Sequence, residues 1–215
     1  MATAAFIPVS EHEPLFRSLD GPVLEQFDCG SEPQSDFYTN DAWEHQQKRY
    51  SRTFVMYYKG MKAGFLSLSP SEIQLGRKER PPEAPFATFP ALKIVQMGLD
   101  KRFQGLKLGP QLVYYAIARA RAAEDAYAYV ILDSRPEVVG FYKKLGFEEN
   151  ERATTAKRAD AEKHGRDPAM STVSMRFDLR EVGQQELPSK ASTGGGWMIA
   201  VASALGLIVG WRRKH

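Results

Sequence analysis

The sequence is poor in the residues from which disulfide frameworks and most protein metal sites are built. It has one cysteine, Cys29, and its four histidines are scattered without the spacing of metal ligands. This scarcity excludes an internal disulfide framework and a cysteine-rich zinc site, and we expect no bound metal. A strong excess of charge is missing too, because 29 Lys and Arg residues offset 26 Asp and Glu residues and leave a net charge of +3. So small a value does not by itself indicate a nucleic-acid-binding protein.

Long apolar runs are also scarce, with one exception near the C-terminus. No signal peptide is expected, because residues 1–6 contain no basic residue and Glu11 soon interrupts the apolar positions. Residues 197–211, by contrast, contain no charge, begin and end with Trp, and precede the basic cluster Arg212–Lys214. Counted from Thr193, a helix would be about 28 Å long, close to the thickness of a bilayer core. We therefore expect a C-terminal transmembrane helix; the alternatives are a helix in the membrane interface and a buried core helix.

The composition predicts one soluble domain in front of this anchor. Apolar residues make up 43% of the chain and charged residues 26%, values typical of globular proteins. We predict a domain over residues 1–180, a flexible linker over 181–196 and the anchor with its basic tail over 197–215. Small residues recur at every fourth position of the anchor and would let two anchors pair as a homodimer: Ala202, Gly206 and Gly210.

Hydrophobic periodicity within the domain predicts strands and helices in alternation. β-branched and aromatic residues at 53–58, a turn at Lys59–Gly60 and alternation at 63–69 predict a β-hairpin. Strands are predicted at 91–100 and 127–132, and because the helix after Gly109 lies between them, they should be parallel strands joined by a crossover. The remaining expectations are a helix-tolerant segment at 42–49, a loop at 76–89, a helix at 136–145, a solvated loop or frayed helix at 151–169 and a strand at 174–179.

A glycine-containing turn before the predicted helix is the first candidate binding site. Gln104–Pro110 contains two glycines, which let backbone amides approach a ligand, and the helix N-terminus adds unpaired N–H donors. Five basic residues and no acidic residue lie between Lys101 and Arg121. These features indicate a site for an anion such as a pyrophosphate, although such turns also join strands to helices for structural reasons. The spacing matches neither the Rossmann fingerprint nor a P-loop.

Three motifs in this order resemble the GNAT superfamily of N-acetyltransferases. Residues 90–100 are similar to the family's fourth strand, Gln104–Gly109 to its Q-x-x-G-x-G pyrophosphate loop, and Phe141–Phe147 to its F-Y-x-x-x-G-F element. The resemblance covers about residues 8–179. It implies an α/β (α+β) fold with a mixed central sheet flanked by helices, in which the parallel strands 4 and 5 splay apart.

The resemblance implies acetyl-CoA as co-substrate and no metal. A strand amide would stabilise the oxyanion that forms when a primary amine attacks the acetyl group, and Tyr142 would protonate the departing CoA thiolate. Gly98 would leave room for the thioester. The alternative for Tyr142 is an aromatic residue that packs beneath the sheet. The residues implied to bind the pantetheine arm and the pyrophosphate are Met97, Gly98, Leu99, Gln104, Gly105, Leu106, Lys107, Leu108 and Gly109.

Three positions leave the implied chemistry open. Lys107 replaces the middle glycine of the loop motif. Either its ammonium points toward a phosphate while its amide still donates, or the position needs a positive φ and lysine strains it. Glu72 is one candidate for the general base, with a plain surface glutamate as its alternative; water or an acceptor amine of low pKa would also serve. We expect Cys29 to be a small buried residue.

The N-terminal half resembles a narrower group, the acetyltransferase toxins of bacterial toxin–antitoxin modules. The similar segments are 27–30, 36–37, 49–55 and 64–69. Those toxins acetylate the α-amine of aminoacyl-tRNA, so the resemblance makes tRNA a conceivable partner. The basic residues that would contact its phosphates, or else form a solvated surface, are Lys48, Arg49, Arg52, Arg77, Lys78 and Arg80.

Together these observations predict a membrane-tethered N-acetyltransferase that acts on a primary amine of unknown identity. Because acetyl-CoA is cytosolic, the catalytic domain would face the cytoplasm. The alternatives are a toxin-like enzyme that acetylates aminoacyl-tRNA and a catalytically inactive module that binds CoA at the membrane.

Overall fold

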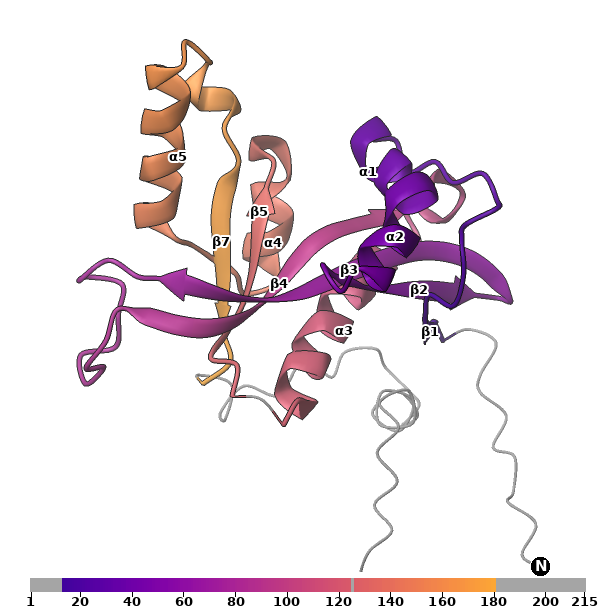
Figure 1. The fold of residues 1–215 in the computed structure, drawn as a ribbon, viewed down its shortest axis with the longest axis horizontal. Coiled ribbons are helices and arrows are strands. Elements are labelled where there is room, and N and C mark those ends of the chain that lie inside the picture. The colour runs from indigo at the N-terminus through magenta and orange to yellow at the C-terminus, as the bar shows by residue number, and fades with distance from the viewer. Residues whose placement is uncertain (1–12, 125, 181–215) are drawn as a thin grey trace, which may run out of the picture.

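The computed structural model describes residues 13–124 and 126–180, which fold around a seven-stranded sheet (Figure 1). The strand order is β1-β2-β3-β4-β5-β7-β6, and β4 and β5 are parallel whereas all other neighbours are antiparallel. This is the mixed sheet that the sequence predicted. The strands are β1 Leu15–Ser18, β2 Arg52–Tyr58, β3 Met61–Gln74, β4 Thr88–Leu99, β5 Tyr129–Ser134, β6 Glu148–Glu149 and β7 Val173–Asp178.

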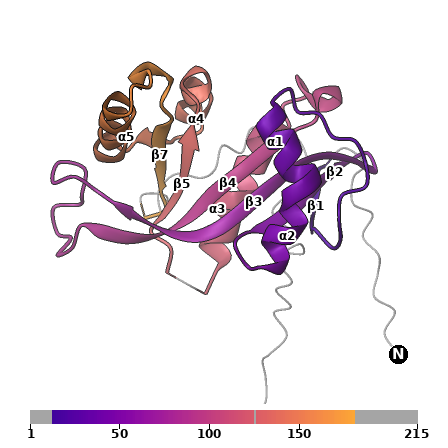
Figure 2. The same ribbon diagram turned by 45° about the horizontal axis from the view of Figure 1, so that its top comes forward.

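Helices cover both faces of this sheet (Figure 2). One face carries α3 and α4, whose buried side chains form the main core with apolar residues of β2 to β5 and β7. The other face carries α1 and α2, joined by a turn of π-helix, over a second core centred on Phe65. The α-helices are α1 Glu32–Asp36, α2 Ala42–Gln47, α3 Gly109–Ala122, α4 Val139–Lys144 and α5 Glu151–Lys163.

The hairpin and the crossover follow the sequence prediction. β2 and β3 pair around the turn Lys59–Gly60, in which both residues have positive φ, 49° and 76°. Two consecutive positive φ angles are typical of a type I′ turn, whose twist matches that of the strands. The helix α3 connects β4 to β5, as the parallel arrangement of these strands requires.

Some elements differ from the expectation. The segment 151–169, expected as a solvated loop or frayed helix, contains the thirteen-residue helix α5. It is ordered because the side chain of Asn150 accepts a hydrogen bond from the Ala153 N–H as an N-cap, and because Thr154 and Ala161 are buried. The strand β1 was not predicted, since four residues carry too little periodicity to be recognised.

The hairpin of β3 and β4 extends beyond its neighbours. β2 pairs with β3 only as far as Leu68, and β5 first pairs with β4 at Ala91, yet β3 and β4 continue to pair out to Gln74 and Thr88. Residues 69–90 therefore form a projecting two-stranded segment with its loop, which we call the arm (Figure 1).

No helix among residues 13–124 and 126–180 is long and apolar enough to cross a membrane. The expected linker and the expected anchor at 197–211 lie outside the described residues. The anchor, its pairing and the domain boundary at residue 180 therefore stay predictions.

Candidate active site

The parallel strands β4 and β5 separate partway along their length and form a fork. They pair from Ala91 opposite Tyr129 to Ile94 opposite Leu132 and no further. At the same point the register between β3 and β4 shifts, so that Val95 has a partner in neither neighbouring strand. Such a bulge bends the strand and re-aims its backbone groups. The predicted splay is thus present, and it is accompanied by one unpaired residue.

A cavity of about 490 Å³ occupies this fork. Residues of β4, β5 and α4 line it, and so do residues near α1, which means that it passes between the strands from one face of the sheet to the other. Asp133 is the one carboxylate among its lining residues. The complete lining is Cys29, Ser31, Gln34, Ile94, Val95, Gln96, Met97, Gly98, Leu99, Gln104, Leu132, Asp133, Ser134, Arg135, Val138, Phe141 and Tyr142.

Tyr142 places a hydroxyl group in the cavity from α4. Its ring packs in the main core against Phe141 and Phe147, and its hydroxyl donates to the sulfur of Met97 on β4, 3.5 Å away. The Tyr142 ring therefore packs beneath the sheet, as the alternative predicted, and its hydroxyl still reaches the cavity. Burial raises the pKa of Tyr142 to about 12, and the charge of Arg135 offsets this only in part. The hydroxyl is thus protonated at neutral pH and can act as an acid.

The glycine loop, Gln104–Gly109, follows β4 after one short 3-10 turn at Lys101–Phe103. Gly105 and Lys107 have φ angles of 80° and 58°. The Gln104 amide donates to the carbonyl oxygens of Cys29 and Leu99, each 3.0 Å away, and so ties the loop to the end of β4. The loop leads directly into α3, whose N-terminal N–H groups make it suited to a diphosphate.

Lys107 adopts the left-handed conformation that a glycine would occupy without strain. A non-glycine residue there costs about 1–2 kcal/mol. Its side chain is exposed, and no described residue pairs with its ammonium group. The backbone strain at Lys107 and a free ammonium group were two alternatives at the sequence level, and the structure has both.

The implied cofactor residues fall into two groups. Met97, Gly98, Leu99 and Gln104 line the cavity together with Tyr142. The remainder form the loop at its end without lining it, with Leu106 exposed, Leu108 buried in the main core and Gly109 next to the Phe141 ring: Gly105, Leu106, Lys107, Leu108 and Gly109. Their contacts with acetyl-CoA stay predictions.

The packing around Gly98 gives a reason for its small size that is separate from room for a thioester, which stays a prediction. A Cβ atom at this position would lie 2.7 Å from Cε1 of Phe65 and 3.2 Å from Sγ of Cys29. The absent side chain is therefore required by the packing of β4 against the second core, on the α1 side of the sheet. Cys29, expected to be buried, is half-buried and borders the cavity.

Several residues line the cavity although the sequence did not predict that they would. Asp133 belongs to an apolar strand, and its only sequence signal is its place directly after the apolar run 127–132. Gln34 and Cys29 reach the cavity from chain more than 50 residues before β4, and a contact of that kind has no local signature.

Glu72 and the basic residues proposed to contact RNA lie away from the cavity. Glu72 stands opposite Pro90 in the arm and is not among the residues that line the fork cavity; its role as general base stays a prediction. The basic residues separate into one group near the α2–β2 connection and another at the arm tip, because Arg52 lies opposite Leu68 while Arg77 follows the end of β3. At about 3.3 Å per residue, the intervening strand spans roughly 20 Å.

A family model described as "Acetyltransferase (GNAT) domain" matches residues 23–160. Among solved structures, AtaT complexed with acetyl-methionyl-tRNAfMet is similar at 17% identity with a TM-score of 0.61, covering 80% of this chain and 98% of that one. A tyrosine-to-phenylalanine mutant of KacT (15% identity, 80% and 99% covered, TM-score 0.58) and a bacterial toxin (14%, 94% and 100%, 0.56) are also similar. No curated protein sequence matches the chain.

The fork, the loop and the tyrosine fit the co-substrate of this family. The loop offers backbone amides and a lysine to a diphosphate, and the cavity between the strands has room for a pantetheine arm. Residues 13–124 and 126–180 contain no group of three or more potential ligands that could hold a metal ion. With the family model matching more than half of its length, the chain belongs to the GNAT acetyltransferases and uses acetyl-CoA as its acetyl donor.

Proposed function

We propose that the chain transfers the acetyl group of acetyl-CoA to a primary amine at the fork between β4 and β5. The observation that carries this proposal is the Tyr142 hydroxyl, which a ring packed in the main core holds at the cavity, where it donates to Met97. The neutral amine attacks the acetyl carbonyl carbon, and the carbon–sulfur bond breaks. Tyr142 gives its proton to the departing thiolate, while the amine loses one to water. A backbone amide of β4 close to the bulge at Val95 would stabilise the oxyanion.

The α-amine of aminoacyl-tRNA is the second candidate acceptor. AtaT, which shares the fold, has been solved in complex with acetyl-methionyl-tRNAfMet, the product of such a transfer. Exposed basic residues at the arm tip offer phosphate contacts to an RNA. The cognate antitoxin that AtaT binds suggests looking for a protein inhibitor here as well.

Transfer of radiolabelled acetyl from acetyl-CoA tests both candidates. The acceptors are a pool of charged tRNA, uncharged tRNA, and a panel of amino acid amides, polyamines and lysine peptides. We expect label on at least one amine with the wild type and a large loss with Tyr142→Phe. Equal low incorporation by both proteins would contradict an enzyme. Label on charged but not uncharged tRNA would select the toxin-like acceptor.

Alkylation of the single cysteine, Cys29, distinguishes an inactive CoA-binding module from an enzyme. Because Cys29 borders the cavity, bound acetyl-CoA should slow its alkylation by N-ethylmaleimide. Protection of Cys29 without turnover on any acceptor would establish the module.

Tethering to a membrane is a further part of the proposal and rests on the sequence of residues 197–211. The full chain should sediment with membranes and leave them only in detergent, whereas a chain that ends at residue 189 should not. Full-length protein in the soluble fraction would overturn the tether. Crosslinking of the membrane fraction tests whether the anchors pair.

A further inference from the structure

The arm and α5 enclose a groove on the face of the sheet opposite α3 and α4. Its floor is formed by β4, β5 and β7, where Lys93, Ile131 and Ser174 alternate with residues that point into the main core. The groove has a volume of about 380 Å³. Leu132 and Asp133 line both this groove and the cavity of the fork, so the two spaces adjoin. We call it the arm–α5 groove.

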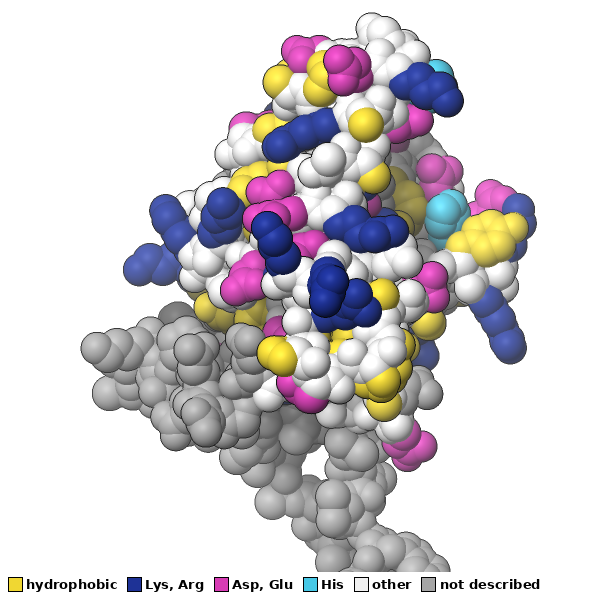
Figure 3. Space-filling model, turned by 90° about the vertical axis from the view of Figure 1, so that its left-hand side faces the viewer, with side chains coloured by type: hydrophobic (Ala, Val, Ile, Leu, Met, Phe, Trp, Pro, Cys, Tyr) yellow, Lys and Arg dark blue, Asp and Glu magenta, His cyan; other side chains and the backbone are white. Residues whose placement is uncertain are grey.

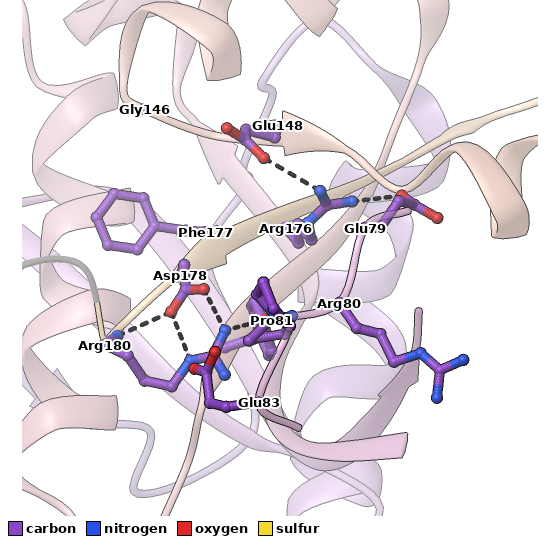
Figure 4. Close-up of a pocket in the computed structure, with 12 residues that line it drawn as sticks. Glu79, Arg80, Pro81, Glu83, Gly146, Glu148, Arg176, Phe177, Asp178 and Arg180 are labelled. Carbon is purple, nitrogen blue, oxygen red and sulfur yellow. Dashed lines mark hydrogen bonds and ion pairs between the residues drawn. The ribbon is translucent and has the colours of Figure 1, made fainter. Parts of the chain in front are cut away.

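Glu79 holds the two walls of this groove together. Its carboxylate, 9% exposed, accepts hydrogen bonds from the N–H groups of Gly76, Glu151 and Arg152. It also forms an ion pair with Arg176 at 2.6 Å (Figure 4). The loop of the arm thus caps the N-terminus of α5 and is fixed to β7. Burial would raise the pKa of Glu79, but these donors outweigh it and hold the pKa below its ordinary value. The groove is therefore preformed.

Asp133 stands where the groove meets the fork. Its two oxygens accept from Lys93 of β4, at 2.8 Å, and from Lys157 of α5. Lys157 also donates to Thr172 at 3.2 Å. The three charged groups leave one net positive charge at the junction, and they come from the floor and one wall of the groove.

The groove is polar and carries more positive than negative charge. Ala153 and Ala156 are small residues that line the groove from α5, and polar residues of the arm and of α5 surround them. The charged lining residues are Lys93, Arg152 and Lys157 against Glu72 and Asp133. Seen from the arm side, Lys and Arg side chains are spread over the surface among Asp and Glu (Figure 3).

We propose that the arm–α5 groove binds the acceptor, whose amine reaches the acetyl group through the junction at Asp133. The class of acceptor that fits is extended and carries negative charge behind its amine, as the aminoacyl end of an RNA does. Lys93 and Lys157 would contact that charge, and Glu79 is a positioning residue that keeps the groove open. The inference rests on the proposed function and specifies where the acceptor lies.

Filling the groove from α5 tests the inference. Ala156→Trp places an indole where a methyl group lines the groove, whereas Ala159→Trp, on the same helix and also exposed, is the matched control because Ala159 does not line it. With charged tRNA as acceptor, we expect KM to rise about tenfold or more in Ala156→Trp and to stay at the wild-type value in Ala159→Trp. Protection of Cys29 by acetyl-CoA should be the same in all three proteins.

The charge of the acceptor is tested by Lys157→Gln, which should raise KM for charged tRNA and flatten its salt dependence. Equal KM values for the two tryptophan variants would overturn the groove as the acceptor site. Transfer to a lysine peptide but not to charged tRNA would overturn the anionic class. If the wild type acetylates nothing in the panel while Cys29 is still protected, the proposed function itself fails.

Discussion

The donor side of the site and the acceptor side are built in different ways. The donor side uses two short motifs: a loop that follows β4 after one short turn, and an α4 tyrosine a few residues beyond β5. The arm–α5 groove is instead held by contacts between segments far apart in the sequence, such as the bond from the Glu151 N–H to Glu79, 72 residues earlier. Apart from the bond that ties Gln104 to Cys29, the donor side depends on local backbone conformation, whereas the acceptor side depends on tertiary contacts. The two should therefore respond to different mutations.

Removing the Tyr142 hydroxyl should produce the largest effect, confined to chemistry on the donor side. Tyr142→Phe keeps the ring in the core but cannot protonate the thiolate, so kcat should fall by about 10²- to 10³-fold. Single-turnover transfer to the best acceptor measures it. Cys29 protection by acetyl-CoA should be unchanged, and a matching loss of protection would assign Tyr142 to binding instead.

The raised pKa of Tyr142 also determines how the rate of acetyl transfer depends on pH. With a pKa of about 12, the hydroxyl keeps its proton when the pH rises through the neutral range. The rate should therefore increase with pH as the acceptor amine loses its proton, without a decline below about pH 10. A basic limb near neutrality that disappears in Tyr142→Phe would show that this tyrosine titrates much lower.

Breaking the clamp at Glu79 should unfold the acceptor side first. Glu79→Ala leaves Arg176 and the α5 N-terminus without their buried partner, which should cost about 3 kcal/mol of unfolding free energy. Urea denaturation measures this cost. Glu83→Ala is the control, because Glu83 is exposed in the same loop and should change stability by less than about 0.5 kcal/mol.

The loss at Glu79 should depend on pH with a definite sign. Because folding lowers the pKa of Glu79, its contribution is complete above the unfolded pKa of about 4.3 and fades as the pH falls through the folded value. The difference between wild type and Glu79→Ala should therefore shrink in acid. A constant difference from pH 7 to pH 3 would mean that the Glu79 charge contributes nothing.

The same contrast explains which parts of the structure the sequence could predict. The parallel strands, the crossover helix and Tyr142 were accessible because periodicity and a spaced motif are local properties. Asp133 and Glu79 were not, since a charged residue after an apolar strand and a glutamate in a loop with three prolines look like ordinary surface positions. Their roles arise from Lys157 and Arg176, which approach only after α5 and β7 have packed.

Gly98 connects the donor side to the second core, and a single methyl group should reveal this. In Gly98→Ala the new Cβ would overlap the fully buried ring of Phe65, so the variant should lose about 1–3 kcal/mol of stability. Gly140→Ala is the control: its Cβ would meet nothing within 4 Å, and in helix α4 alanine should stabilise by about 0.5–1 kcal/mol. Thermal unfolding compares them, and a Gly98→Ala protein as stable as wild type would show that Phe65 can move aside.

The smallest effect should come from Lys107, where strain and charge oppose each other. Lys107→Gly relieves a φ of 58° and should stabilise the fold by at most about 1 kcal/mol, as should Lys59→Gly, which relieves a φ of 49° in the hairpin turn far from the loop. Only Lys107→Gly removes an ammonium from the loop that we expect to bind the diphosphate, so only this variant should need more acetyl-CoA to protect Cys29. The increase should be several-fold at low salt and smaller at high salt, because screening weakens an exposed charge.

Tighter acetyl-CoA binding by Lys107→Gly would reverse this interpretation. It would mean that Lys107 restricts the loop conformation without contacting the diphosphate. The positive φ at this position would then have no benefit for acetyl-CoA binding. Because Lys59→Gly changes the same kind of φ without touching the loop, any difference between the two variants belongs to the side chain at position 107. The donor side would then depend on charge only through the backbone amides of the loop and the N-terminus of α3.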